Sequence, residues 1–167
     1  MIEGVQDKIN SILSTSLEAN LAAERSPSGG VALPLIAPKK YLINFDPETT
    51  ILTQDLLPAL IQIPEKTPPN HTLQGYHTYW EHRIRLALIV EQVHTGDALT
   101  ACETLQRQRS RYAKAIIKTL WAHQQEDPIY KVTLNDILYS KMMHNAEESR
   151  FVGSVWLYLT VLEKEVI

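Results

Sequence analysis

Cysteine is almost absent from this chain of 167 residues, in which Cys102 stands alone. One cysteine cannot form an intramolecular disulfide, so the pattern excludes a disulfide-stapled secreted domain. No stretch approaches the 18 uninterrupted apolar residues of a membrane-spanning helix. The first residues lack the basic and apolar regions of a signal peptide. We therefore expect a soluble protein that is made and kept in a cytoplasm, with no membrane partner.

An excess of positive charge is also absent. The chain has 16 Lys and Arg against 19 Asp and Glu, which gives a net charge of −3. The molecule as a whole is therefore not a general electrostatic binder of nucleic acid or acidic membranes. A chain of this length buries roughly 70% of its unfolded surface, so we expect one domain over residues 1–167 that needs no metal or disulfide for stability.

Recognisable catalytic motifs are missing as well. There is no HExxH, no Cys/His zinc spacing and no G-x-S-x-G, and Gly29-Gly30 lacks the Lys-Ser/Thr of a P-loop. Cys102 lies on the apolar stripe of a predicted helix, which favours packing over reactivity. The histidines are predicted to be surface or hydrogen-bonded groups: His71, His77, His82, His94, His123 and His144. We expect no enzymatic activity, no cofactor and no metal.

Apolar residues at helical spacing predict two helices. The first covers residues 2–23, and the second begins at Asp97, the predicted N-cap, and runs to about Gln124. The predicted inner stripe of the second helix consists of Leu99, Cys102, Leu105, Tyr112, Ile116, Ile117 and Leu120. Its charged residues are expected mostly outside that stripe: Glu103, Arg107, Arg109, Arg111, Lys114 and Lys118.

Strands are predicted at 41–45, 59–63, 76–93, 130–139 and 152–163. Prolines on both sides of 59–63 favour an edge position or strand ends. Strict alternation from Trp80 to Val90 makes 76–93 the clearest strand. It is much longer than the usual 5 to 6 residues. We expect an α+β fold, with a mainly antiparallel sheet, both helices on one face, and long strands projecting as a hairpin.

Three segments are predicted to lack regular structure. Residues 26–40 form a Pro/Gly-punctuated connector and 65–75 a polar loop, and both are expected to be extended. Residues 141–149 form a polar connection between the last two strands. The loop 65–75 contains Pro68 and Pro69.

Two groups of residues are candidates for contacts with partners. Arg107, Arg111, Lys114 and Lys118 line one helical face, which is either a solvated surface or one that meets an acidic partner or DNA phosphates. The second group lies around the outer end of the long strand, where the aromatic residues are either packing or interface groups. It comprises Pro68, Pro69, Tyr76, Tyr79, Arg83 and Arg85.

The order of these elements resembles the tail-terminator proteins of long-tailed bacteriophages and the related minor tail and head–tail joining proteins. The residues that carry the resemblance are the Leu57–Pro64 segment, the long strand Tyr79 to Glu91, the charged helix after it and the final apolar strand Ser154 to Glu163. It covers the chain from about residue 41 onward, and the N-terminal helix also fits.

The resemblance implies a structural subunit of the virion tail or neck, assembled in the host cytoplasm. It implies a homo-hexameric ring that caps the tail tube, ends its polymerisation and joins it to the neck. The implied partners are other copies of the chain, the tail-tube protein and neck or connector proteins, with DNA at most passing through the lumen.

Other functions stay open on the residues alone. A head-completion or stopper protein of the neck would contact the connector instead. A small enzyme or ligand-binding domain would use a pocket on the sheet lined by Trp80, His82 and Tyr158. A nucleic-acid binder would use Arg107 to Lys118, with affinity that falls steeply as salt rises.

Overall fold

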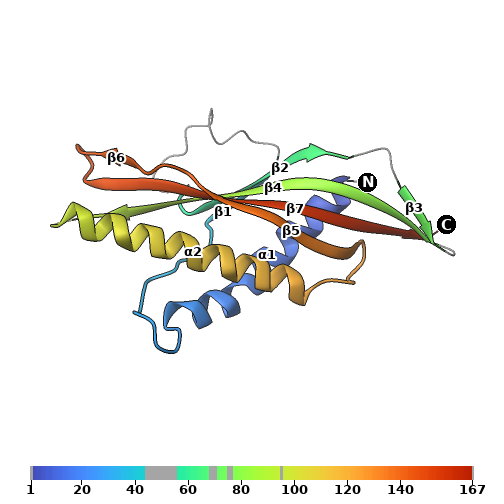
Figure 1. Cartoon of the computed structure of the whole chain (residues 1–167), viewed down its shortest axis with the longest axis horizontal. Coiled ribbons are helices and arrows are strands. Elements are labelled where there is room, and N and C mark those ends of the chain that lie inside the picture. The colour runs from blue at the N-terminus through green and yellow to red at the C-terminus, as the bar shows by residue number, and fades with distance from the viewer. Residues whose placement is uncertain (1, 44–55, 68–70, 75–76, 95, 167) are drawn as a thin grey trace.

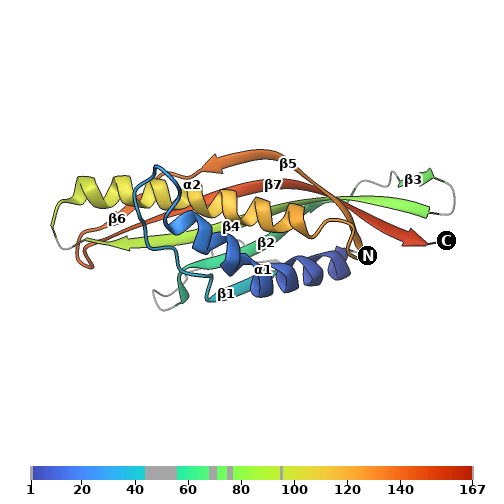
Figure 2. The same ribbon diagram turned by 90° about the horizontal axis from the view of Figure 1, so that it is seen from below.

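The computed structural model describes residues 2–43, 56–67, 71–74, 77–94 and 96–166. It has two layers, a seven-stranded sheet and two helices that both cover one face of it (Figures 1 and 2). In chain order the elements are α1 (Ile2–Arg25), β1 (Lys40–Ile43), β2 (Ala59–Lys66), β3 (His71–Gln74), β4 (His77–Val93), α2 (Ala98–Ala122), β5 (Ile129–Tyr139), β6 (Met143–Asn145) and β7 (Arg150–Val166). The α+β fold with both helices on one face is confirmed.

The centre of the sheet is the antiparallel pair of β4 and β7. All 17 residues of each strand are in register, from His77 opposite Val166 to Val93 opposite Arg150. The sheet order is β1-β2-β4-β7-β5, with β3 added to β4 and β6 added to β7. Among the described strands, β1 and β2 form the one parallel pair. The prediction of a mainly antiparallel sheet is therefore correct.

Both central strands are long enough to extend past the helical layer. At about 3.3 Å per residue, each spans about 55 Å. At the end where β3 lies, the β4–β7 ribbon continues beyond both helices (Figure 1). The two long strands pair with each other but are not the two arms of one hairpin, because α2, β5 and β6 lie between them in the chain. The hairpin partner of β4 is the short strand β3.

The main core lies between the helices and the sheet. The predicted apolar stripe of α1 is buried, including Val5, Ile9 and Leu17 at 0–1% exposure. It packs with α2 against alternate residues of β4 and β7, such as Leu86 and Leu157. Since successive side chains of a strand point to opposite faces, the intervening residues form a second, outer face of the sheet, opposite to the helices.

The prolines around residues 59–63 favoured an edge position or strand ends, and the edge position is wrong, whereas Pro58 does directly precede the first residue of the strand. The strand extends from Ala59 to Lys66 and lies between β1 and β4. Proline cannot donate a ladder hydrogen bond. Pro64 is tolerated because the pairing of β2 with the described residues of β1 ends at Gln62, and because the register with β4 shifts between Pro64 and Lys66.

Two short strands form inside segments that were predicted to be loops. β3 lies within 65–75 and pairs with His77–Trp80, and β6 lies within 141–149 and pairs with Arg150–Val152. Both are short, mostly polar segments of three or four residues that pair with a neighbouring long strand. Periodicity in the sequence cannot reveal strands this short.

The connector 26–40 has no helix or strand before β1 begins at Lys40, as predicted. Tyr112 of α2 holds it in place, since its hydroxyl accepts from the backbone N–H of Ile36 and donates to the carbonyl of the same residue, each at 2.7 Å. Arg25 at the end of α1 donates to the carbonyl of Leu35 at 2.8 Å. Side chains of both helices therefore fix its path.

Candidate interaction surface

The outer face of the sheet is not covered by either helix, and it carries an apolar cluster. Ile61, Ala87 and Trp156 are buried there, and Leu42, Ile63, Ile89 and Tyr158 pack around them half-buried. These residues come from four neighbouring strands, β1, β2, β4 and β7. The cluster therefore crosses the sheet from its β1 edge to its centre.

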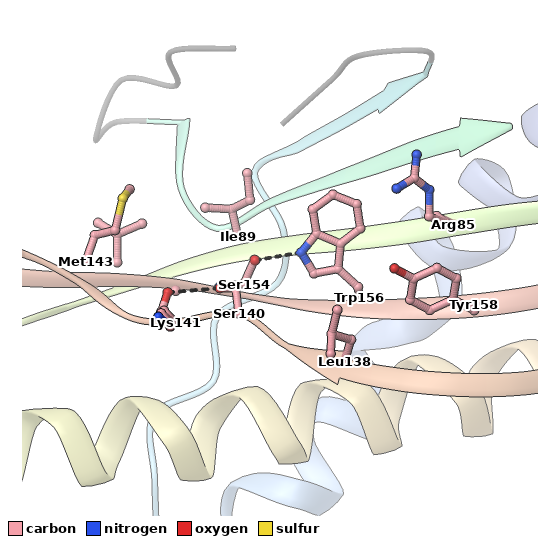
Figure 3. Close-up of a pocket in the computed structure, with 11 residues that line it drawn as sticks. Arg85, Ile89, Leu138, Ser140, Lys141, Met143, Ser154, Trp156 and Tyr158 are labelled. Atoms are coloured by element: carbon pink, nitrogen blue, oxygen red, sulfur yellow. Dashed lines mark hydrogen bonds between the residues drawn. The ribbon is translucent and has the colours of Figure 1, made fainter. Parts of the chain in front are cut away.

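Beside this cluster the outer face is hollowed into a groove of about 460 Å³. Figure 3 shows the groove between β4, β7 and the chain that leads from β5 into β6. It is lined by Arg85, Ile89, Leu138, Ser140, Lys141, Met143, Val152, Gly153, Ser154, Trp156 and Tyr158. Leu138 is 52% exposed and Met143 is 70% exposed. Exposed apolar side chains gathered in one hollow are typical of a surface that meets another macromolecule.

Trp156 forms the centre of the groove, and its orientation is fixed on two sides. Its indole Nε1 donates to Ser154 Oγ at 2.8 Å. The Arg85 guanidinium lies over the indole ring, 5.2 Å from its centroid, and is also 3.1 Å from a carboxylate oxygen of Glu65. A cation over a tryptophan face is attracted by the ring quadrupole. The groove thus combines an apolar floor with the positive groups Arg85 and Lys141.

Arg109 lies below the groove and is buried, although the helical pattern predicted it to be outside the inner stripe of its helix. Arg109 was expected outside the inner stripe of its helix, but it is only 3% exposed. Its Nη1 donates to the carbonyls of Ser140 at 2.7 Å and Ser154 at 3.0 Å, two residues that line the groove. Its Nη2 donates to Gln106, and Nε has no hydrogen-bond partner among the described residues. Burial lowers the pKa of Arg109.

Gly153 makes this approach possible. A Cβ at this position would lie 3.1 Å from Nη1 of Arg109 and 3.4 Å from its Cζ. Glycine within a strand often marks a close approach of another group. A glycine inside a predicted strand was therefore the signal in the sequence that another group, here the Arg109 side chain, approaches this strand closely.

The predicted basic face of α2 meets an acidic group of the same chain. Glu24 of α1 is 4% exposed, and its carboxylate lies 3.0 Å from Lys114 Nζ and 3.2 Å from Lys118 Nζ. Arg111 donates to the carbonyl of Glu24 at 3.2 Å. Arg107 is exposed. Three of these four residues therefore join the two helices, and contact with an acidic partner or DNA stays a prediction.

The other predicted contact residues do not form one described cluster. Pro68, Pro69 and Tyr76 lie outside the described residues. The Tyr79 ring packs on Tyr130 of β5 with centroids 4.8 Å apart. Arg83, with half of its side chain exposed, lies 3.5 Å from Glu81, and Arg85 is in the groove. Their role as interface residues stays a prediction.

The alternative pocket lined by Trp80, His82 and Tyr158 does not form. His82 is 2% exposed and belongs to the helix-facing side of β4, where its Nε2 lies 2.7 Å from Glu163 and its Nδ1 lies 2.9 Å from Thr67 Oγ1. Tyr158 lines the groove on the outer face. Alternation along the strands therefore separates these side chains to opposite sides of the sheet.

Two further properties concern the described part of the chain. No group of three or more His, Cys, Asp or Glu side chains there is arranged to hold a metal ion. None of its helices is long and apolar enough to cross a membrane.

Comparison with known proteins identifies no family. No family model matches the sequence, and no curated protein matches it. One solved chain with a similar structure is described as "Virion of native gene transfer agent (GTA) particle". It is 12% identical, with a TM-score of 0.45 over 97% of this chain and 96% of that chain. A likeness of this size carries no argument about function.

Proposed function

We propose that this chain is a structural subunit of a bacteriophage tail or neck. In this role it forms a homo-hexameric ring that caps the tail tube, ends its polymerisation and joins it to the head-side neck. It assembles in the host cytoplasm and stays in the virion, and DNA passes through the ring. The resemblance noted in the sequence supplies this hypothesis, and the geometry of the sheet supports it.

The observation that carries the proposal is the β4–β7 ribbon. It continues past both helices, and its outer face holds the groove around Trp156. An isolated domain gains little from strands that continue past its own helices, because the projecting end of the ribbon has no helix to pack against. A projecting ribbon on one copy and an apolar groove on the next would form a heterologous, head-to-tail contact. Contacts of this kind close into rings when the rotation between copies allows it.

The first test is the mass of the native particle, measured by light scattering over a range of protein concentrations. The proposal expects a ring-sized species that grows as the concentration rises, and co-sedimentation with assembled tail-tube protein. A protein that stays monomeric at high concentration and does not bind the tube contradicts it. Pull-down with connector protein separates the terminator role from that of a stopper, since a stopper would bind the connector and leave the tube free.

A further inference from the structure

Two histidine side chains meet at the end of the sheet opposite to β3. His94 directly follows β4, and His144 is the middle residue of β6. Their Nε2 atoms are 3.1 Å apart. The backbone N–H of His94 donates to the carbonyl of Ser149 at 2.8 Å, and His144 pairs with Phe151 across the β6–β7 ladder. Backbone contacts therefore fix both residues next to the same turn, although 50 positions separate them in the sequence.

One aromatic ring supports both imidazoles. The Phe151 ring stacks on His144, with centroids 4.4 Å apart and planes 19° apart. It also lies 5.4 Å from the His94 ring, at an angle of 37°. These contacts restrict the rotation of both rings while the two Nε2 atoms face each other. The pair is thus arranged before any ligand binds, which lowers the entropic cost of binding.

We propose that His94 and His144 form a binding site for a divalent transition-metal ion such as Zn²⁺, Ni²⁺ or Cu²⁺. Metal–nitrogen bonds to histidine are about 2.0–2.1 Å, so two such nitrogens on one ion lie about 2.9 Å apart at a right angle and about 3.3 Å apart at a tetrahedral angle. The observed 3.1 Å falls between these values. Imidazole nitrogen suits these ions better than Mg²⁺ or Ca²⁺, which prefer oxygen ligands.

Binding changes which nitrogen carries the proton in one of the two rings, the one that donates from Nε2 when no metal is bound. In the absence of metal, one Nε2 donates its proton to the lone pair of the other. In the bound state both rings carry their proton on Nδ1 and direct the Nε2 lone pair at the ion. His144 is exposed and His94 is half-buried, so water can fill the remaining coordination positions. The site belongs to the class with two protein ligands and open positions.

The charges around the pair do not oppose a cation. The nearby Arg150 is neutralised by two carboxylates: its Nη1 lies 2.7 Å from Glu91, and its Nε pairs with Glu148. The guanidinium and the two carboxylates together carry a net negative charge. The site therefore offers two lone pairs in a weakly negative environment at the surface.

The test is calorimetric titration of the full, untagged protein with ZnCl₂ and with NiCl₂ in a buffer that does not bind metal. We expect one equivalent of ion to bind. His94→Ala and His144→Ala should each lower the affinity at least tenfold, because a single imidazole remains. His123→Ala is the matched control: His123 lies at the far end of α2 beside Glu126, and its loss should leave the affinity unchanged. Circular dichroism checks that each variant is folded.

NMR of the wild-type imidazoles provides a second measurement that needs no variant. Addition of Zn²⁺ should shift the side-chain resonances of His94 and His144 and leave those of His123 in place. The proposal is overturned if no ion binds at millimolar concentration, if the shifts occur at other histidines, or if both alanine variants bind as tightly as the wild type.

Discussion

Arg109 shows how much one side chain contributes to holding two parts of the fold together. It extends from α2, passes over Gly153 and donates to the backbone on both sides of the groove floor, at Ser140 and Ser154. Its guanidinium also lies 5.6 Å from the centroid of the Tyr139 ring. Among the described residues no carboxylate forms an ion pair with it. Arg109 therefore stabilises the fold through the several N–H donors of its planar guanidinium group, which a lysine lacks.

We predict that Arg109→Lys lowers the free energy of unfolding by about 1–3 kcal/mol, because a buried ammonium cannot reproduce several fixed hydrogen bonds. Arg107→Lys, an exposed change on the same helix, is the matched control and should stay within about 0.5 kcal/mol of the wild type. Urea unfolding followed by circular dichroism measures both. Equal stabilities of the two variants would show that these guanidinium donors contribute nothing.

Tyr112 supports a second prediction at this scale, since its hydroxyl holds both backbone groups of Ile36. Tyr112→Phe should lower the free energy of unfolding by about 1–2 kcal/mol, because both backbone groups lose their partner. Tyr41→Phe is the control, as the Tyr41 hydroxyl makes one longer bond of 3.4 Å to the carbonyl of Leu13. Guanidinium unfolding at pH 7 compares the variants, and an equal loss in both would contradict the assignment.

The same tyrosine should make the free energy of unfolding depend on pH in the alkaline range. Burial raises the pKa of Tyr112 to about 12, against an ordinary value of 10.0. Because the pKa is raised in the folded state, the stabilisation of the fold by the protonated Tyr112 hydroxyl is complete below pH 10 and is lost as the pH rises from 10 towards 12. The stability difference between the wild type and Tyr112→Phe should therefore shrink over that interval. A difference that stays constant from pH 9 to pH 11.5 would contradict it.

Residue-level burial could be predicted from the sequence in part. The stripe of α1 was predicted correctly, because an amphipathic helix on a sheet buries one continuous face. In α2 the same reasoning failed for Leu99, which is 68% exposed, and for Arg109. Leu99 lies in the first turn of α2, where Ala101 is only 7% exposed, so this turn does face the core and Leu99 lies off its buried side. The spacing assigned Leu99 to the inner stripe, but the buried side of this part of α2 runs through Ala101 and Leu105.

At the scale of elements, the contact between the two helices depends on Glu24. Burial alone would raise the pKa of this carboxyl, but hydrogen bonds from Lys114 and Lys118 lower it below its usual 4.5. A lowered pKa in the folded state stabilises the fold above pH 4.5, and this stabilisation is lost as the pH falls through the folded value.

We therefore predict that Glu24→Gln lowers the free energy of unfolding at pH 7 by about 1 kcal/mol, a modest value because both lysines are about half exposed. The loss should decrease steadily below pH 4.5, since the wild-type carboxyl is then protonated too. Glu18→Gln, which breaks the more exposed pair with Arg25, is the control and should have a smaller effect. Urea unfolding at pH 7 and pH 3.5 tests this, and a loss that is equal at both pH values argues against it.

Long helices and strands could be predicted from the sequence, and short strands could not. The alternation over 76–93 and the helical spacing over 2–23 each repeat often enough to give type and position. β3 and β6 have only three or four residues, most of them polar, and exist because long strands offer them backbone partners. The groove is likewise invisible to local patterns, since its residues come from four strands and meet only once the register of β4, β5, β6 and β7 is known.

At the scale of the whole molecule, the proposed ring makes a prediction about the outer face. Leu138→Asp places a charge in the groove and should abolish the concentration-dependent assembly while the monomer stays folded, because this leucine is already half exposed. Leu99→Asp is the matched control, an exposed leucine on the helical side of the molecule. Light scattering reports the particle mass of both. Assembly that survives Leu138→Asp, or is lost equally with Leu99→Asp, would exclude the groove as the contact.

The central place of β7 in the sheet has a consequence for biosynthesis. β4 and β5 both pair with β7, yet β7 is translated after both of them. While the ribosome is still making residues 150–166, the nascent chain already carries two long strand edges without their shared partner. Such non-local pairing is slow and leaves edges open to other chains. The sheet therefore cannot be completed until residues 150–166 have been made, and a chaperone that shields strand edges should raise the yield more than one that acts on the early helix.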